Sequence, residues 1–223
     1  VLIIGNSVAI DLLMSFDQNI DFFNDYEFRE YYFKPQYLFE NSYKEKLEVN
    51  KLTKNKLFLD ADILMVSALY NDYETRFSRN NVVNLLNNFA KKHGKLLVIT
   101  GNIPVFYDKS GINPVLSILL KNKKNNLSNE DLEKLYYERL SSNFISIGNI
   151  VKENAKKSDI IFLDKFDYAC NLDKKKCGAL TDEKKLIYFD GIHYTKDGAK
   201  YFGKIMYEID WLSPIDDYYK KIN

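Results

Sequence analysis

Short apolar runs alternate along the chain with longer segments whose apolar residues recur every three or four positions. The short runs predict five β-strands, near residues 1–4, 31–38, 63–67, 95–100 and 160–163. The longer segments predict amphipathic helices, among them 7–16, 78–92, 128–157 and a closing helix from Thr195. We expect the third of these helices to break near Gly148.

Strands that alternate with helices favour one parallel sheet covered by helices on both faces. The fold class expected is a three-layer α/β/α, flavodoxin-like (doubly wound) sheet of about five strands. In such sheets, ligand sites lie beyond the carboxyl ends of the strands. Polar residues fall at those ends in this chain: Ser7 after the first strand, Asn71 after the third and Asn102 after the fourth.

Length and composition restrict the function. With 223 residues, of which 46% are hydrophobic, the chain is long enough for one domain spanning 1–223. No apolar run approaches the ~18 residues that cross a bilayer. Lys and Arg number 32 against 31 Asp and Glu, so no basic footprint indicates a nucleic-acid partner. The chain begins inside a strand-like segment, so we expect it to be the C-terminal part of a longer protein.

Cys170 and Cys177 are the only cysteines. Both lie in a polar, Lys-rich stretch, where buried free thiols would be unusual. Two free thiols are the alternative, but this context favours a local disulfide between Cys170 and Cys177, which we predict. A disulfide would imply an oxidising, extracytoplasmic compartment. The pair lacks the companions that a zinc site requires, so we expect no metal.

An acid–base pair stands near the C-terminal end, where Asp190 precedes His193 by three positions. At this spacing the carboxylate can hydrogen-bond the imidazole and leave the other ring nitrogen free to act as a base. Ser7 stands at a strand-to-helix turn, where early helix N–H groups point at any oxyanion formed beside it. Ser7 could instead be only a helix cap, and Asp190 only a turn cap. Taken together, the three residues predict a serine esterase or acyltransferase.

These motifs resemble a known superfamily. Gly5-Asn6-Ser7, Asn71-Asp72 and Asp190-x-x-His193 resemble blocks one, three and five of the SGNH (GDSL-like) hydrolases, over nearly the whole chain. More narrowly, the chain resembles the SGNH domain attached to acyltransferase-3 membrane proteins. This narrower resemblance is carried by Ala61–Leu64 leading to Ser67–Tyr70, by the Gly101–Val105 turn, and by a cysteine pair shortly before Tyr188.

The chain also departs from the superfamily pattern. Asn6 replaces the usual Asp before the nucleophile, and Leu69 stands where the third block has a glycine. No glycine occurs between Gly5 and Gly94, so the oxyanion glycine of the second block is missing. A reduced oxyanion hole would slow hydrolysis, which suits a transferase acting on a delivered donor.

The resemblance implies a catalytic triad of Ser7, His193 and Asp190. It also implies an oxyanion hole made by the backbone N–H groups of Ser7 and Val8 together with Asn71, and it implies no cofactor. The activity implied is an O-acetyltransferase that moves an acetyl group onto a sugar hydroxyl of a cell-surface polysaccharide, for example a lipopolysaccharide.

The implied partners are an acyl donor delivered by a membrane acyltransferase domain and a glycan acceptor. We therefore expect an extracytoplasmic domain, on the periplasmic or cell-surface side, tethered to the cytoplasmic membrane in the full-length protein. Two alternatives remain open: a free-standing carbohydrate acetylesterase of the same fold, and a non-catalytic flavodoxin-like binding module. No glycine-rich phosphate loop supports the binding module.

Aromatic residues are dense between Phe22 and Phe39. They could form a sugar-stacking wall near the active site, or they could simply pack in the core.

Overall fold

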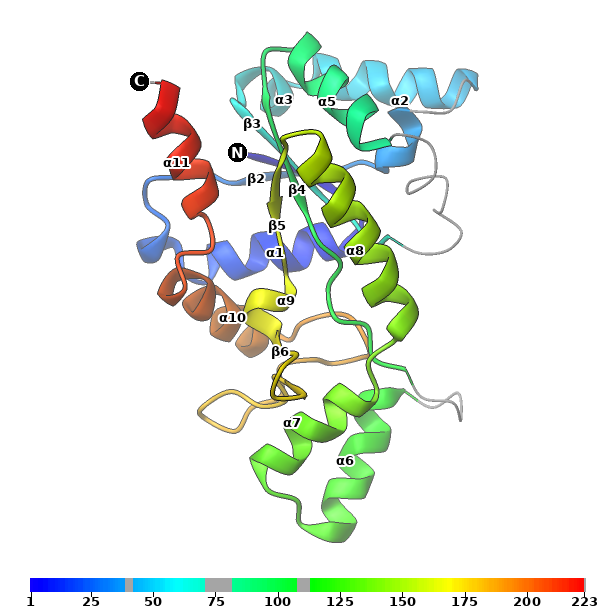
Figure 1. Cartoon of the computed structure of the whole chain (residues 1–223), viewed down its shortest axis with the longest axis vertical. Helices are drawn as coiled ribbons and strands as arrows, with labels where there is room; N and C mark the ends of the chain where they lie inside the picture. Colours follow the sequence, from blue (N-terminus) through cyan, green and yellow to red (C-terminus); the bar gives the residue numbers. More distant parts are fainter. Residues whose placement is uncertain (39–41, 71–81, 108–112, 223) are drawn as a thin grey trace.

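A five-stranded parallel sheet lies between two layers of helices (Figure 1). The computed structural model describes residues 1–38, 42–70, 82–107 and 113–222. The strand order is β2-β1-β3-β4-β5. The strands are β1 (Leu2–Gly5), β2 (Arg29–Tyr32), β3 (Ile63–Ser67), β4 (Leu96–Thr100) and β5 (Ile161–Leu163). The three-layer α/β/α fold predicted from the sequence is thus confirmed.

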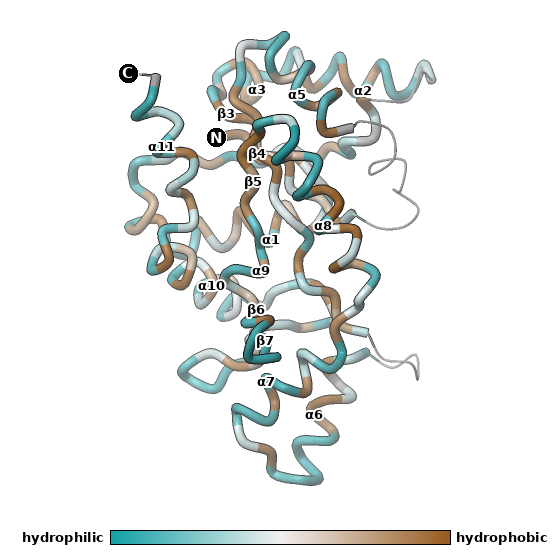
Figure 2. Tube along the Cα trace, viewed as in Figure 1, coloured by the Kyte–Doolittle hydropathy of each residue, from teal (hydrophilic) through white to brown (hydrophobic). Residues whose placement is uncertain are grey.

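Helices cover both faces of the sheet because alternate strand residues point to opposite sides. Ile3, Met65 and Val98 face α1 (Ser7–Asp17), α10 (Lys196–Glu208) and α11 (Ser213–Ile222). Their neighbours Leu2, Leu64 and Leu97 face the second layer. That layer contains α2 (Tyr43–Lys54), α3 (Lys56–Asp60), α5 (Val82–Lys92) and α8 (Ser142–Lys157). The apolar residues of β4 and β5 form an almost continuous hydrophobic trace along the two strands (Figure 2).

The remaining elements lie at the edges of this core. Two short 3₁₀ turns, η1 (Ile20–Phe22) and η2 (Pro35–Leu38), flank β2. A helical hairpin of α6 (Pro114–Asn125) and α7 (Asn129–Glu138) projects beyond the sheet (Figure 1). Beside α7 lies the two-stranded ribbon of β6 (Cys170–Asn171) and β7 (Lys176–Cys177), which follows α9 (Phe166–Ala169).

Two predicted boundaries were wrong. The second strand ends at Tyr32, and Pro35 opens a 3₁₀ turn, because proline suits the first position of a helical turn. The helical region 128–157 breaks at 139–141, whereas Gly148 lies inside α8. The break occurs there because the chain pairs with a neighbouring segment: Tyr107 donates to the Arg139 carbonyl at 2.8 Å, and Ser141 donates to the Val105 carbonyl at 2.9 Å. Residues 78–81 of the predicted helix 78–92 lie outside the described residues.

The start of α1 is fixed by a close approach between two strands. β1 pairs with β3 so that Gly5 lies opposite Ser67. A Cβ at Gly5 would come within 1.7 Å of the Ser67 carbonyl oxygen. Only glycine fits at this position, so the turn that leads into α1 can sit directly against the end of β3.

α1 also packs tightly on α10. The side-chain amide of Asn19 donates to the Ser15 carbonyl at 2.8 Å and to the Lys200 carbonyl at 3.0 Å, which ties the end of α1 to α10. A Cβ at Gly203 would come within 2.3 Å of the Ser15 carbonyl. Glycine at 203 therefore sets the distance between the two helices.

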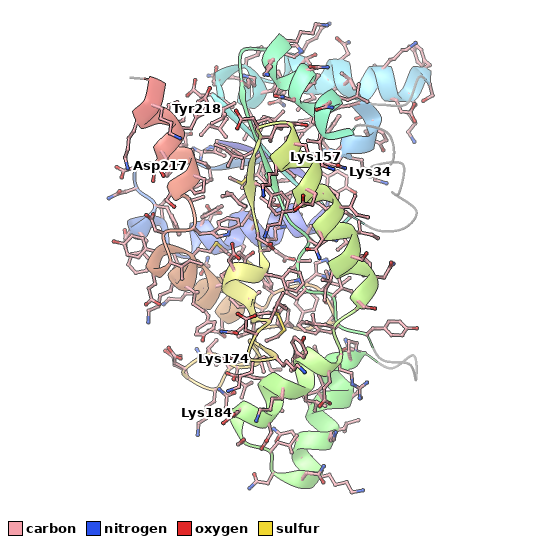
Figure 3. The ribbon with its side chains drawn as sticks, in the orientation of Figure 1. Lys34, Lys157, Lys174, Lys184, Asp217 and Tyr218 are labelled. Atoms are coloured by element: carbon pink, nitrogen blue, oxygen red, sulfur yellow. A yellow bond between two sulfur atoms is a disulfide. The ribbon has the colours of Figure 1, made fainter. Side chains whose placement is uncertain are left out.

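Many charged side chains lie on the outside of this core. Lys157, Lys174 and Lys184, labelled in Figure 3, are all exposed. Among the described residues, no helix combines the length and the apolar character that crossing a membrane requires.

Substitution of Gly203 by Ala should destabilise the protein. The added methyl group would push α10 away from α1, and overpacking of this kind costs about 1–3 kcal/mol, which exceeds the gain in helix propensity. Urea denaturation should show a loss of about 1–2 kcal/mol in unfolding free energy. The matched control is Lys204→Ala on the exposed side of α10, which should change stability by less than about 0.5 kcal/mol. Equal stability of the two variants would contradict the close-packing argument.

Candidate functional site

Ser7 is the first residue of α1 and is exposed to solvent. The strand β1 ends at Gly5, and Asn6 then caps the helix by accepting a hydrogen bond from the Val8 N–H through its side chain. This places Ser7 at the positive end of the helix dipole. The same edge of the sheet carries the switch in strand order between β1 and β3, where ligands bind in doubly wound folds.

The Asp190–His193 turn approaches Ser7 from the segment before α10. Asp190 Oδ1 accepts hydrogen bonds from the backbone N–H groups of Ile192 at 2.6 Å and His193 at 2.7 Å. These bonds form a compact turn that begins and ends on the two residues. The turn is held from outside by Phe106, whose N–H donates to the Gly191 carbonyl at 2.8 Å. A Cβ at position 191 would meet the Phe106 carbonyl at 2.6 Å, so glycine is required there as well.

The structure brings Ser7, His193 and Asp190 together in a hydrogen-bonded row. His193 Nε2 lies 2.9 Å from Ser7 Oγ, and His193 Nδ1 lies 2.8 Å from Asp190 Oδ2. With Nδ1 donating to the carboxylate, Nε2 can accept the Ser7 proton. The row therefore has the order that nucleophilic catalysis requires: a hydroxyl, an imidazole that can act as its base, and a carboxylate that can orient the imidazole.

The local environment keeps Asp190 ionised. Partial burial alone would raise its pKa, but the hydrogen bonds from the His193 side chain and from the two backbone N–H groups outweigh that effect and hold the pKa below its usual value. Asp190 is thus a carboxylate at neutral pH. A carboxylate in contact with Nδ1 favours positive charge on the imidazole when the base takes up a proton.

The predicted oxyanion donors are only partly described. The Val8 N–H already donates to Asn6 Oδ1, at a long distance of 3.3 Å. Asn71 lies outside the described residues. Tyr70, the residue just before it, is held by the Asn102 side chain, which accepts from the Tyr70 N–H at 2.7 Å and donates to the Tyr70 carbonyl at 3.0 Å. Asn102 therefore fixes the point from which the segment containing Asn71 departs.

Phe189 was missed by the sequence analysis. Its ring stacks on His193, with ring centroids 5.6 Å apart and an angle of 13° between the planes. The side chain is 58% exposed, although the adjacent Tyr188 is fully buried. Its position next to Asp190 was the only signal in the sequence.

The aromatic stretch 22–39 was considered as a sugar-stacking wall or as core. Phe23 and Phe28 pack in the core against Phe16, and Phe39 lies outside the described residues.

A cluster of aromatic side chains packs around Tyr188, just before the Asp190–His193 turn. Tyr188 contacts Phe106 and Tyr136, with ring centroids 4.9 Å and 5.9 Å away. Tyr136 belongs to α7, so the α6–α7 hairpin packs against the segment that carries Asp190 and His193. The described residues contain no group of His, Cys, Asp and Glu that could hold a metal ion.

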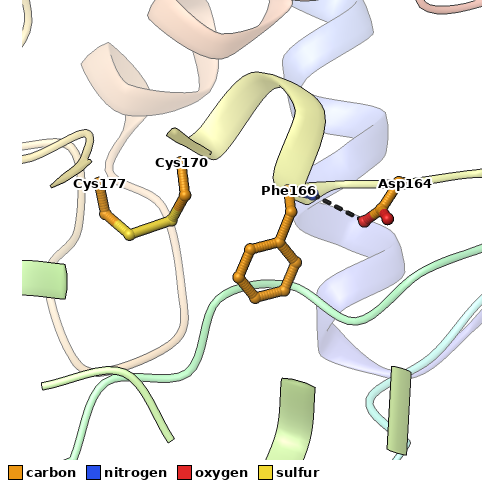
Figure 4. Close-up of a disulfide and its surroundings, with 4 residues drawn as sticks. All are labelled: Asp164, Phe166, Cys170 and Cys177. Atoms are coloured by element: carbon orange, nitrogen blue, oxygen red, sulfur yellow. Dashed lines mark hydrogen bonds between the residues drawn. A yellow bond between two sulfur atoms is a disulfide. The ribbon is translucent and has the colours of Figure 1, made fainter. Parts of the chain in front are cut away.

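Cys170 and Cys177 form a disulfide that joins β6 to β7 (Figure 4). The bridge lies directly after α9, whose start is fixed by Asp164. Asp164 Oδ1 accepts from the Phe166 N–H at 3.1 Å, and the Asp164 carbonyl accepts from the Trp211 indole at 2.9 Å. The disulfide and Asp164 therefore hold both ends of α9.

Comparison with known proteins identifies the family. The chain belongs to the family of SGNH domains that are fused to AT3 domains, since the family model matches residues 1–208. The resemblance noted in the sequence is thereby confirmed. Members of the wider SGNH superfamily are serine esterases and acyltransferases. No curated protein matches the chain in sequence.

Solved structures share the fold at low sequence identity. The periplasmic domain of a lipopolysaccharide acetyltransferase from Salmonella ser. Paratyphi A superposes with a TM-score of 0.72 at 15% identity, covering 94% of this chain and 82% of that one. A carbohydrate acetylesterase family member from Sinorhizobium meliloti gives 0.51 at 10% identity, with 94% and 96% covered. An aryl esterase from M. smegmatis gives 0.50 at 12% identity, with the same coverage.

Loss of the disulfide should destabilise the protein. In the chain-entropy account, a bridge closing a loop of this size contributes about 2–3 kcal/mol. The double variant Cys170→Ser/Cys177→Ser should lose about that much unfolding free energy in urea. Without reductant, wild-type protein should also resist alkylation at both cysteines. Ready alkylation, or an unchanged urea midpoint in the double variant, would show that the bridge is not formed or does not stabilise the fold.

Proposed function

We propose that this chain is an O-acetyltransferase domain. It transfers an acetyl group through Ser7, His193 and Asp190 onto a sugar hydroxyl of a cell-surface polysaccharide. The observation that carries the proposal is the row of hydrogen bonds from Asp190 through His193 to an exposed serine at a helix N-terminus. Membership of the family fused to AT3 domains favours transfer from a membrane partner.

In the first half of the reaction, Ser7 takes the acetyl group from the donor. His193 Nε2 accepts the Ser7 proton while Oγ bonds to the carbonyl carbon of the donor. The resulting oxyanion faces the N-terminus of α1, where the Ser7 and Val8 N–H groups and Asn71 are the proposed donors. The leaving group takes the proton from His193 as its bond to the carbonyl carbon breaks, which leaves an acetyl ester on Ser7.

In the second half, a sugar hydroxyl removes the acetyl group from Ser7. His193 accepts the hydroxyl proton, the sugar oxygen bonds to the carbonyl carbon, and the proton passes to Ser7 Oγ as the ester breaks. Because Ser7 is exposed, water can take the place of the sugar. A carbohydrate acetylesterase is therefore the second candidate function, and both functions use the same acetyl-enzyme.

Phe189 supports a sugar acceptor. A sugar ring presents an apolar face of C–H groups that stacks on aromatic rings, and the Phe189 ring is exposed beside the base. A sugar lying on Phe189 would hold a hydroxyl near His193 Nε2. We propose Phe189 as the acceptor platform of this site.

The proposed partners are an acyl donor delivered by a membrane acyltransferase domain and a glycan acceptor. The disulfide supports an oxidising, extracytoplasmic location. The periplasmic domain of the Salmonella lipopolysaccharide acetyltransferase, which shares the fold, supports the same location. We propose that residues 1–223 form one such domain, tethered to the cytoplasmic membrane within a longer protein.

Ser7→Ala and His193→Ala should each lower the hydrolysis of a small activated acetyl ester by roughly 10³-fold or more. The double variant should be little worse than either single variant, because residues that act as a unit are not additive. Release of the aryl alcohol, followed by absorbance, measures the rate. His93→Ala, which removes the other histidine at the end of α5, is the matched control and should retain activity. Full activity of Ser7→Ala would refute the proposed nucleophile.

Phe189→Ala should weaken binding of sugar esters more than binding of a small aryl ester. Loss of one stacking contact should raise KM for an acetylated monosaccharide roughly 5-fold, while Phe189→Tyr retains the ring and should stay near wild type. Phe22→Ala, an exposed aromatic beyond the other end of α1, is the control and should leave both KM values unchanged. An equal effect of Phe189→Ala on both esters would assign Phe189 to supporting His193 rather than to binding sugar.

A further inference from the structure

Two buried titratable side chains lie beneath the candidate triad and have no part in the mechanism above. Asp11 is 6% exposed and Lys165 is 1% exposed. Lysine and aspartate are almost never buried this completely without a partner, because removing a charge from water is strongly unfavourable. Their burial at this place therefore requires a physical reason.

Asp11 lies on the nucleophile helix, close to the turn that carries the base. It follows Ser7 by one helical turn on α1, on the same face of the helix. The backbone N–H of Tyr194, the residue directly after His193, lowers the pKa of the Asp11 carboxyl. Within the part of the chain that the structure describes, its Oδ2 atom is buried without a hydrogen-bond partner. Asp11 is thus a buried carboxylate near the His193 turn, with one oxygen unused.

Lys165 reaches the start of α1 from the segment that follows β5. Its backbone lies between Asp164 and Phe166, the anchored start of α9 (Figure 4). Its Nζ donates to Ser67 Oγ at 2.8 Å, and Ser67 Oγ donates in turn to the Val8 carbonyl at 3.4 Å. Lys165 therefore brings a positive charge under the first turn of α1, beside the residue that follows Ser7.

The charges of these groups act on one another. Burial raises the pKa of Asp11 to about 6, and the positive charges of His193 and Lys165 oppose that rise. Burial lowers the pKa of Lys165 to about 7, and Asp11 opposes that fall. Asp190 also faces Asp11 and disfavours its charge. The phenols of Tyr168, Tyr188 and Tyr194 face it too, but burial raises their pKa values, so they stay neutral.

We propose that Asp11 is a positioning residue of the active site: its buried carboxylate, one turn after Ser7 on α1, stabilises the positive charge that His193 gains when it takes the Ser7 proton. This inference rests on the proposed triad and adds a second carboxylate to it. Asp190 orients the ring from the solvent side, whereas Asp11 acts from within the core, where low polarity strengthens the attraction.

The test measures the activation of Ser7 without an acetyl donor or a sugar. An alkyl fluorophosphonate forms an Oγ–P bond with Ser7 and releases fluoride, while the Ser7 proton passes to His193. The labelling rate of wild-type protein is compared with that of Asp11→Asn, which keeps the size and shape of the side chain but removes the charge. The control is Asp17→Asn, at the exposed end of the same helix.

At pH 7.5, Asp11→Asn should be labelled about 10-fold more slowly than wild type, and Asp17→Asn at the wild-type rate. The ratio of wild-type to Asp11→Asn rates should shrink toward one as the pH falls below about 6, because Asp11 then becomes neutral in wild type as well. The pH dependence that both proteins share through the triad cancels in this ratio. A purely structural role would give a ratio that does not change with pH.

The variant Lys165→Met keeps the proposal testable if Asp11→Asn does not fold. Without the buried cation, Asp11 should hold its proton to higher pH, so the labelling rate of Lys165→Met should fall about 10-fold relative to wild type at pH 6.5 and recover as the pH rises.

Wild-type rates in Asp11→Asn, or a ratio independent of pH, would overturn the role of Asp11 and leave the proposed function intact. Absence of labelling at Ser7 in wild type itself would overturn both.

Discussion

The whole candidate site depends on how closely α1 approaches the segment that ends in α10. The hydrogen bond between Ser7 and His193 joins residues 186 positions apart, and neither residue can correct a shift of its own backbone by more than a fraction of an ångström. Three glycines make this approach possible. Gly5 lets the start of α1 lie against β3, Gly203 lets α10 lie against α1, and Gly191 lets the Asp190–His193 turn lie against Phe106.

Electrostatics adds to this packing. The row from Ser7 to Asp190 lies at the surface, where water screens charges, whereas the Asp11 carboxylate, one turn along the same helix as Ser7, is buried. Buried charges usually lower stability unless they are well paired. The buried side chains of Asp11 and Lys165 lie at the nucleophile helix. This fits the general observation that functional sites contain buried charges whose unfavourable free energy the rest of the fold must offset.

In the proposed mechanism the same geometry serves transfer and hydrolysis, because both reactions pass through an acetyl ester on Ser7. What separates them is the competition between a sugar hydroxyl and water for that ester. Ser7 is exposed to solvent, so water can reach it. The balance between transfer and hydrolysis therefore depends on how well a sugar acceptor is held beside His193. In our proposal the exposed ring of Phe189 holds the acceptor, and the membrane domain supplies the donor.

The sequence by itself determined the layers and the triad candidates. Apolar runs bounded by turns identify buried parallel strands, and Asp-x-x-His with a serine after the first strand is a local chemical pattern that survives without tertiary information. The break at 139–141 escaped this reading, because it is set by pairing with the distant segment 105–107. The end of β2 was misplaced for a local reason, because the aromatic residues after Tyr32 suit a strand but lead into the 3₁₀ turn that Pro35 opens. Phe189, Asp11 and Lys165 also escaped it. Their importance comes from what lies next to them, and neighbours brought together by folding leave no periodic trace in the chain.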